Sequence, residues 1–133
     1  TSTLAAGSHT ITATYNGDTN FTTSTGTDTQ TVMVAATTTT VTSAPNPSDE
    51  QQQVTITATI TPVPPATGTP TGTVSFSING PGGGDFVVPV NSSGQAVLLI
   101  STLDNSTHNI HATYSGDASY TSSTGTASQT TRK

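Results

Sequence analysis

The sequence predicts an all-β protein: a sandwich of two antiparallel sheets with about seven strands, preceded by two strands of a second domain of the same kind. Three observations support this prediction. Apolar residues alternate with threonine over several short stretches, turn-forming residues interrupt the chain every 8–12 residues, and a long segment of the sequence occurs twice. Alternation with a period of two is typical of strands that bury one face, and no segment has the helical period.

The repeated segment sets the domain organisation. A shift of 99 residues aligns 1–34 with 100–133 without a gap, and 17 of the 34 positions are identical. His9 aligns with His108, and Tyr15 aligns with Tyr114. A period of 99 is close to the size of one sandwich domain, about 100 residues. We therefore expect the last two strands of one repeat at 1–34 and a complete repeat at 35–133.

Within the complete repeat, the strands are expected between clusters of proline, glycine and asparagine. The clearest strand alternates Val54, Ile56, Ala58 and Ile60 with threonines and stops at Pro62. A proline has no amide hydrogen to donate, so it ends a strand that lies inside a sheet. The expected strands are 37–43, 53–61, a strand around 74–78, 86–90, 95–101, 108–114 and 125–131.

Composition excludes several functional classes. The net charge is −5, and the two basic residues are the last two of the chain, so there is no basic patch for nucleic acid or for an anionic membrane surface. The sequence has no run of 18 apolar residues, so no segment is expected to insert into a membrane as a helix. Cysteine is absent, which removes disulfides and cysteine-based metal sites. Threonine fills 33 of 133 positions, and its branched side chain favours strands.

Two copies of a short motif identify a family resemblance. The motifs are Tyr15-Asn16-Gly17-Asp18, followed by Phe21, and Tyr114-Ser115-Gly116-Asp117, followed by Tyr120. With the threonine run at 37–40, the Asn46-Pro47 pair and the segment 69–76, they make the chain resemble the bacterial immunoglobulin-like repeats of large surface or secreted proteins. The glycines at 82–84 and the sequence at 104–106 depart from that pattern. The resemblance implies an extracellular or cell-surface location in a bacterium, and it transfers no catalytic residue.

The motif could bind calcium or could stabilise a turn. Calcium takes six to eight oxygen ligands, and one aspartate per turn with no acidic neighbour falls short of that number. We therefore expect a structural turn, in which glycine adopts an unusual backbone angle and aspartate accepts hydrogen bonds from backbone amides. The residues of the two turn motifs are Tyr15, Gly17, Asp18, Tyr114, Gly116 and Asp117.

Other reactive residue types lack the partners that chemistry needs. His108 and His111 are three apart in an expected strand and so face opposite sides, and His9 has no carboxylate nearby in sequence. We expect no enzyme, no cofactor and no metal. An internal threonine–glutamine ester stays open as a hypothesis that the intact mass would test. Three Asn-x-Ser/Thr sequences are candidate glycosylation sites, at Asn20, Asn91 and Asn105.

Three functions fit these observations. The first is an extracellular structural module, a repeat unit of a surface stalk or filament that assembles head-to-tail. The second is an adhesin or carbohydrate-binding module that uses the loops 62–70 and 79–85 at one end of the sandwich. The third is an accessory domain of a secreted hydrolase.

The N-terminal two strands raise a separate question, because a two-stranded sheet is only marginally stable in water. We expect another chain to complete these strands in a head-to-tail assembly, with copies of the chain or adjacent repeats as partners that share strands. Two alternatives remain: the residues are a window onto a longer array, or they replace 100–133 in their own domain. The residues expected to pair with a neighbour are Ile11, Ala13, Tyr15 and Phe21.

Overall fold

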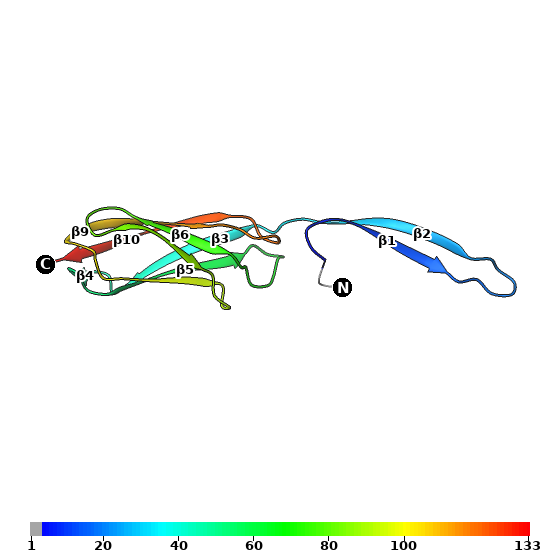
Figure 1. The fold of residues 1–133 in the computed structure, drawn as a ribbon, viewed down its shortest axis with the longest axis horizontal. Helices are drawn as coiled ribbons and strands as arrows, with labels where there is room; N and C mark the ends of the chain where they lie inside the picture. Colours follow the sequence, from blue (N-terminus) through cyan, green and yellow to red (C-terminus); the bar gives the residue numbers. More distant parts are fainter. Residues whose placement is uncertain (1–3) are drawn as a thin grey trace. The chain divides into compact units, whose positions relative to one another are not determined.

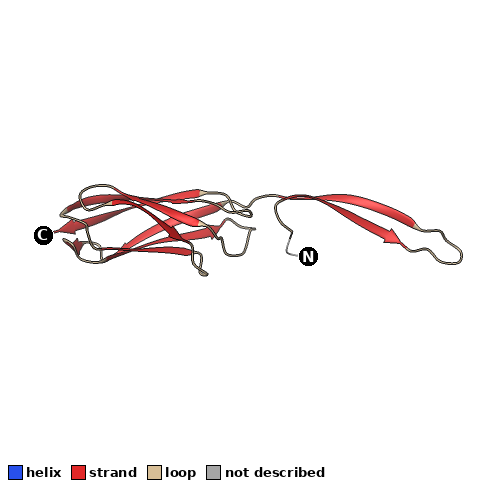
Figure 2. Ribbon diagram, viewed as in Figure 1, coloured by secondary structure: helices blue, strands red, loops and turns tan. Residues whose placement is uncertain are grey.

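The structure is a computed structural model that describes residues 4–133. Every regular element among these residues is a β-strand, which confirms the predicted all-β class (Figure 2). The chain divides into two compact units, unit 1 (Thr1–Val34) and unit 2 (Ala35–Lys133). Each unit is described separately below.

Unit 1 is a long antiparallel hairpin. Its strands are β1 (Gly7–Tyr15) and β2 (Ser24–Val32), paired from Gly7 opposite Val32 to Tyr15 opposite Ser24 (Figure 1). They form a sheet of two strands, and neither strand pairs with a third among the described residues.

Unit 2 is a sandwich of two sheets (Figure 1). One sheet has five strands in the order β4-β10-β9-β6-β7, and the other has three in the order β3-β5-β8. The strands are β3 (Thr37–Ala44), β4 (Ser48–Asp49), β5 (Val54–Pro62), β6 (Thr73–Ile78), β7 (Gly84–Pro89), β8 (Gln95–Ile100), β9 (Ser106–Tyr114) and β10 (Ser123–Arg132).

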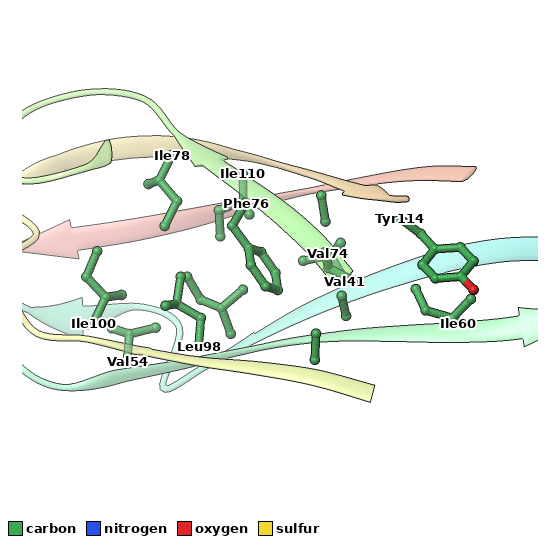
Figure 3. Packing of buried hydrophobic residues seen from close by; sticks show 14 of the residues in the cluster. Val41, Val54, Ile60, Val74, Phe76, Ile78, Leu98, Ile100, Ile110 and Tyr114 are labelled. Carbon is green, nitrogen blue, oxygen red and sulfur yellow. The ribbon is translucent and has the colours of Figure 1, made fainter. Parts of the chain in front are cut away.

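The core of unit 2 lies between the two sheets and follows the period-two pattern of the sequence. In β5 every second residue from Val54 to Ile60 is buried, and the threonines between them are partly exposed. In β6 the ring of Phe76 points between the sheets and is fully buried (Figure 3). Each side chain at this interface gains roughly 1.5–3 kcal/mol from leaving water, so the alternation drives the pairing of the two sheets.

One strand of unit 2 is absent from the sequence prediction. β4 has only two residues and pairs in parallel with the end of β10, with Ser48 opposite Thr131. A two-residue strand is too short to show alternation, and its partner lies more than 80 positions away. The prediction of antiparallel strands alone was therefore wrong at this edge, while the seven longer strands occur where they were expected.

The first and last long strands of unit 2, β3 and β10, run side by side in the same direction. Thr37 Oγ1 donates a hydrogen bond to Thr121 O (2.9 Å) near the start of both strands. Asn46 Nδ2 donates to Ser128 O (2.8 Å), near the other end. The chain therefore enters unit 2 at one end of the sandwich and leaves it at the opposite end (Figure 1).

Candidate functional site

The second turn motif connects β9 to β10 and is held by one carboxylate. Asp117 Oδ1 accepts hydrogen bonds from the amides of Ser119 (2.7 Å) and Tyr120 (2.8 Å), while the amide of Asp117 donates to Tyr120 O (2.9 Å). Gly116 has φ 76°, in the left-handed region where a side chain is disfavoured. The tyrosine, glycine and aspartate of the motif thus build one compact turn.

The other oxygen of Asp117 connects this turn to the loop before β6. Asp117 Oδ2 accepts hydrogen bonds from both the amide and the hydroxyl of Thr71, each at 2.9 Å. Burial acts to raise the pKa of Asp117, but the hydrogen bonds from Thr71, Ser119 and Tyr120 outweigh it and lower the pKa below its usual value. With four donors on its two oxygens, the carboxylate serves as a turn cap and a latch between strands.

The motif tyrosine completes the latch. The hydroxyl of Tyr114 donates to Thr71 O, and its ring is fully buried at one end of the core (Figure 3). Burial, together with the negative charge of Asp117, raises the pKa of Tyr114 to about 12. Thr71 therefore makes three hydrogen bonds with the motif: its amide and its hydroxyl donate to Asp117, and its carbonyl accepts from Tyr114.

The raised pKa of Tyr114 predicts a loss of stability at alkaline pH. Between pH 10 and 12 the unfolded chain releases the tyrosine proton and the folded chain keeps it, so the free energy of unfolding falls as pH rises. The slope is about 1.4 kcal/mol per pH unit. In Tyr114→Phe this contribution should vanish, which urea titrations at pH 9.5 and 11.5 would measure.

Tyr15→Phe is the matched control for that measurement, because Tyr15 occupies the same motif position and is 48% exposed. Its alkaline slope should equal that of the unmodified chain. Equal slopes for Tyr114→Phe and the unmodified chain would contradict the prediction.

The first turn motif, in unit 1, has the same internal geometry and lacks the latch. Asp18 Oδ1 accepts from the amides of Asn20 (2.7 Å) and Phe21 (2.8 Å), and Gly17 again has φ 76°. Among residues 4–133, Asp18 Oδ2 and the hydroxyl of Tyr15 have no hydrogen-bond partner.

The histidines follow the same division between units. His108 is fully buried in β9, with Nδ1 2.8 Å from Asn79 O and Nε2 2.9 Å from Asp104 O. His9, its counterpart, has Nε2 2.7 Å from Ala5 O and no described partner at Nδ1. His111 is exposed on the opposite face of β9. Within residues 4–133, no three side chains of histidine, cysteine, aspartate or glutamate lie together as a metal site.

A buried glutamine joins the last strand to the first part of unit 2. Gln129 Nε2 donates to Pro45 O (2.9 Å) and Ser48 Oγ (3.1 Å), while Oε1 has no donor among the described residues. The hydroxyl bonded to this amide belongs to a serine, whereas the ester hypothesis joins a threonine to a glutamine, so an internal ester stays a hypothesis that the intact mass would test. The hydrogen bonds of Gln129 form a tie between the last strand and the start of the unit.

The three glycosylation candidates are exposed in different places. Asn20 lies in the turn of unit 1, and Asn105 lies between β8 and β9. Asn91 is in the turn before β8, where its Oδ1 accepts from the amides of Ser93 (2.9 Å) and Gln95 (3.1 Å). Glycan attachment at these positions stays a prediction.

The structure separates the two loops that were expected to form a binding site at one end of the sandwich. The loop 62–70 precedes β6 and the loop 79–85 follows it, so the length of β6 places them at opposite ends. The first contacts the β9–β10 turn, through Tyr120 and Thr67, and the second contacts the segment before β9, through Gly82 and Thr102. The expectation of one site built from both loops was wrong.

Sequence reasoning missed Thr71, which contacts the turn motif, and Asn79, whose carbonyl contacts the ring of His108. Their role is carried largely by backbone groups, so the residue type leaves little signal. A local cue is the Pro70-Thr71-Gly72 sequence just before β6, in which Gly72 has φ 113°.

Comparison with known families identifies the family of the chain. The family model of the bacterial Ig-like domain (group 3) matches residues 41–132, which is more than half of the chain. No curated protein matches the sequence. Among residues 4–133, no helix is long and apolar enough to cross a membrane. Because the matched residues cover most of the sandwich and more than half of the sequence, the chain belongs to the bacterial Ig-like domain family, group 3.

Proposed function

We propose that the chain is a structural repeat unit of an extracellular stalk or filament, in which domains follow one another head-to-tail. The family suggests a surface or extracellular module. The observation that carries the proposal is the common direction of β3 and β10, which puts the two chain ends of unit 2 at opposite ends of the sandwich. Successive domains connected in this way extend a chain in one direction.

Three ties distributed along unit 2 support a structural role. Thr39 Oγ1 lies 2.7 Å from Ser123 Oγ where the chain enters the unit, and Gln129 binds Pro45 and Ser48 near the exit. The Asp117–Thr71 latch fastens the turn between the last two strands. Each tie connects segments that are 46 or more residues apart in sequence. The buried and half-buried polar groups of unit 2 therefore hold its own strands together.

Electron microscopy of the native protein would test the proposal. Slender particles with regular beads are expected, and each bead should add at least the length of β10, roughly 33 Å for ten residues. Intact mass from the same sample would separate short subunits in a filament from repeats in one long chain. Compact particles with clustered domains would overturn the stalk and filament proposal.

A further inference from the structure

The hairpin of unit 1 carries an apolar surface that its counterpart in unit 2 buries. Ile11 is 50% exposed and Tyr15 is 48% exposed, while the aligned Ile110 and Tyr114 are fully buried. Phe21 is 67% exposed, whereas the aligned Tyr120 packs against the core. Apolar and aromatic side chains that are packed in unit 2 are therefore exposed at the aligned positions of unit 1.

The polar side chains of the hairpin make only some of the hydrogen bonds that their counterparts in unit 2 make. The bonds that Asp117 makes within the unit 2 turn also occur in unit 1, where the amides of Asn20 and Phe21 donate to Asp18 Oδ1 and the amide of Asp18 donates to Phe21 O. The bonds that unit 2 makes from this turn to Thr71 have no equivalent among residues 4–133. The same holds for the bond between His108 and Asn79, since the ring of His9 reaches only Ala5.

A glycine in β2 provides an independent indication. A Cβ atom built on Gly125 in β10 would overlap the carbonyl of Thr39, because β3 packs directly against that position. Gly26 aligns with Gly125, yet a Cβ atom there meets nothing within 4 Å. Glycine weakens a strand interior, so its presence at Gly26 fits a strand that a backbone like that of β3 approaches closely.

We propose that the unit 1 hairpin is the docking half of a second sandwich, and that its occupant is the β3–β8 part of the preceding repeat in a tandem array of the same polypeptide. This deepens the proposed head-to-tail function and rests on it. The occupant supplies the equivalents of Thr71, Asn79 and Thr39. Most of these contacts use backbone groups, so a body of different side-chain sequence can provide them.

A second copy of the same chain is a poorer occupant. Each copy has two hairpins, β1–β2 and β9–β10, and only one β3–β8 body, which its own β9–β10 already fills. If the hairpin of one copy replaced β9–β10 in another, the displaced hairpin would be left exposed instead. Strand exchange between copies therefore leaves the number of unpaired hairpins unchanged.

The experiment uses the full chain with a copy of residues 35–99 added directly before Thr1. Because residue 100 aligns with residue 1, the added segment joins the hairpin as residue 99 joins residue 100 in unit 2. Amide hydrogen exchange of β1 and β2 is measured in the 133-residue chain and in the extended chain, with β9 and β10 as reference in the same molecule. Protection of β1 and β2 should rise at least about a thousandfold, toward the range of a folded domain.

Gly26→Ala is the matched variant. It should leave exchange in the 133-residue chain unchanged and remove most of the added protection in the extended chain, where the Thr39 equivalent would now be overlapped. Fast exchange of β1 and β2 beside protected β9 and β10 in the extended chain would overturn the proposal. Concentration-dependent protection in the 133-residue chain, with a dimer in sedimentation, would also overturn it in favour of a second copy.

This result is separable from the stalk proposal. Protection of β1 and β2 in the extended chain, together with compact native particles, would support the docking inference and overturn the stalk proposal. Extended native particles with unprotected hairpins in the extended chain would do the reverse.

Discussion

Replacing Phe76 by alanine is expected to destabilise unit 2 by about 3–5 kcal/mol, the usual cost of removing a buried phenylalanine. Phe76 is fully buried between the sheets, and its strand β6 is paired on both sides, with β7 and β9. The surrounding backbone has little freedom to close the cavity that alanine leaves. Since domains of this size are stable by about 5–15 kcal/mol, the loss is a large fraction of the total.

Chemical denaturation would measure this effect as a shift of the midpoint at a constant slope. Phe21→Ala is the control in the same chain, because Phe21 is 67% exposed. It should change the stability of unit 2 by less than about 0.5 kcal/mol. A loss below about 1 kcal/mol for Phe76→Ala, under the usual range for this change, would contradict the packing described for β6.

Gly125→Ala is expected to destabilise unit 2 by about 3 kcal/mol, at the upper end of the range for overpacking. The added methyl group would overlap the Thr39 carbonyl, and this atom belongs to the backbone of β3, which is hydrogen-bonded to β5. A side chain could rotate away from the methyl group, but a paired strand has to shift as a whole.

The matched substitution for this test is Gly26→Ala in unit 1, where the methyl group has open space. Thermal unfolding followed by circular dichroism should show a lower melting temperature for Gly125→Ala alone. A similar decrease for both variants would indicate that the glycines act through strand flexibility and not through contact with β3.

The strands and the core of unit 2 could be predicted because the relevant signal is local. Alternation in β5 and β9 places Ile56 and Ile110 inward from the sequence alone, and both are fully buried. β4 escaped prediction because its pairing with β10 depends on contacts between distant segments. The loops 62–70 and 79–85 were expected at the same end of the sandwich. One strand, β6, lies between them and places them at opposite ends.

Only the contacts that lie within the turn motif could be predicted from the sequence. A cap on the turn amides follows from the glycine and aspartate types, and Asp117 Oδ1 makes these bonds. The contacts to Thr71 and the environment of His108 involve backbone carbonyls and amides, and every residue type except proline carries both groups. Sequence patterns report side chains, so partners that act through their backbone stay hidden until the fold is known.

The common direction of β3 and β10 has a mechanical consequence. Tension applied between the two ends of unit 2 acts along these strands, so it loads their cross-connections in shear. The bond from Glu50 N to Arg132 O, the Gln129 tie and the Thr39–Ser123 contact then bear the force together and must break nearly at once. Resistance to rupture is governed by the barrier to unfolding, and simultaneous breakage raises that barrier above what one bond at a time would give.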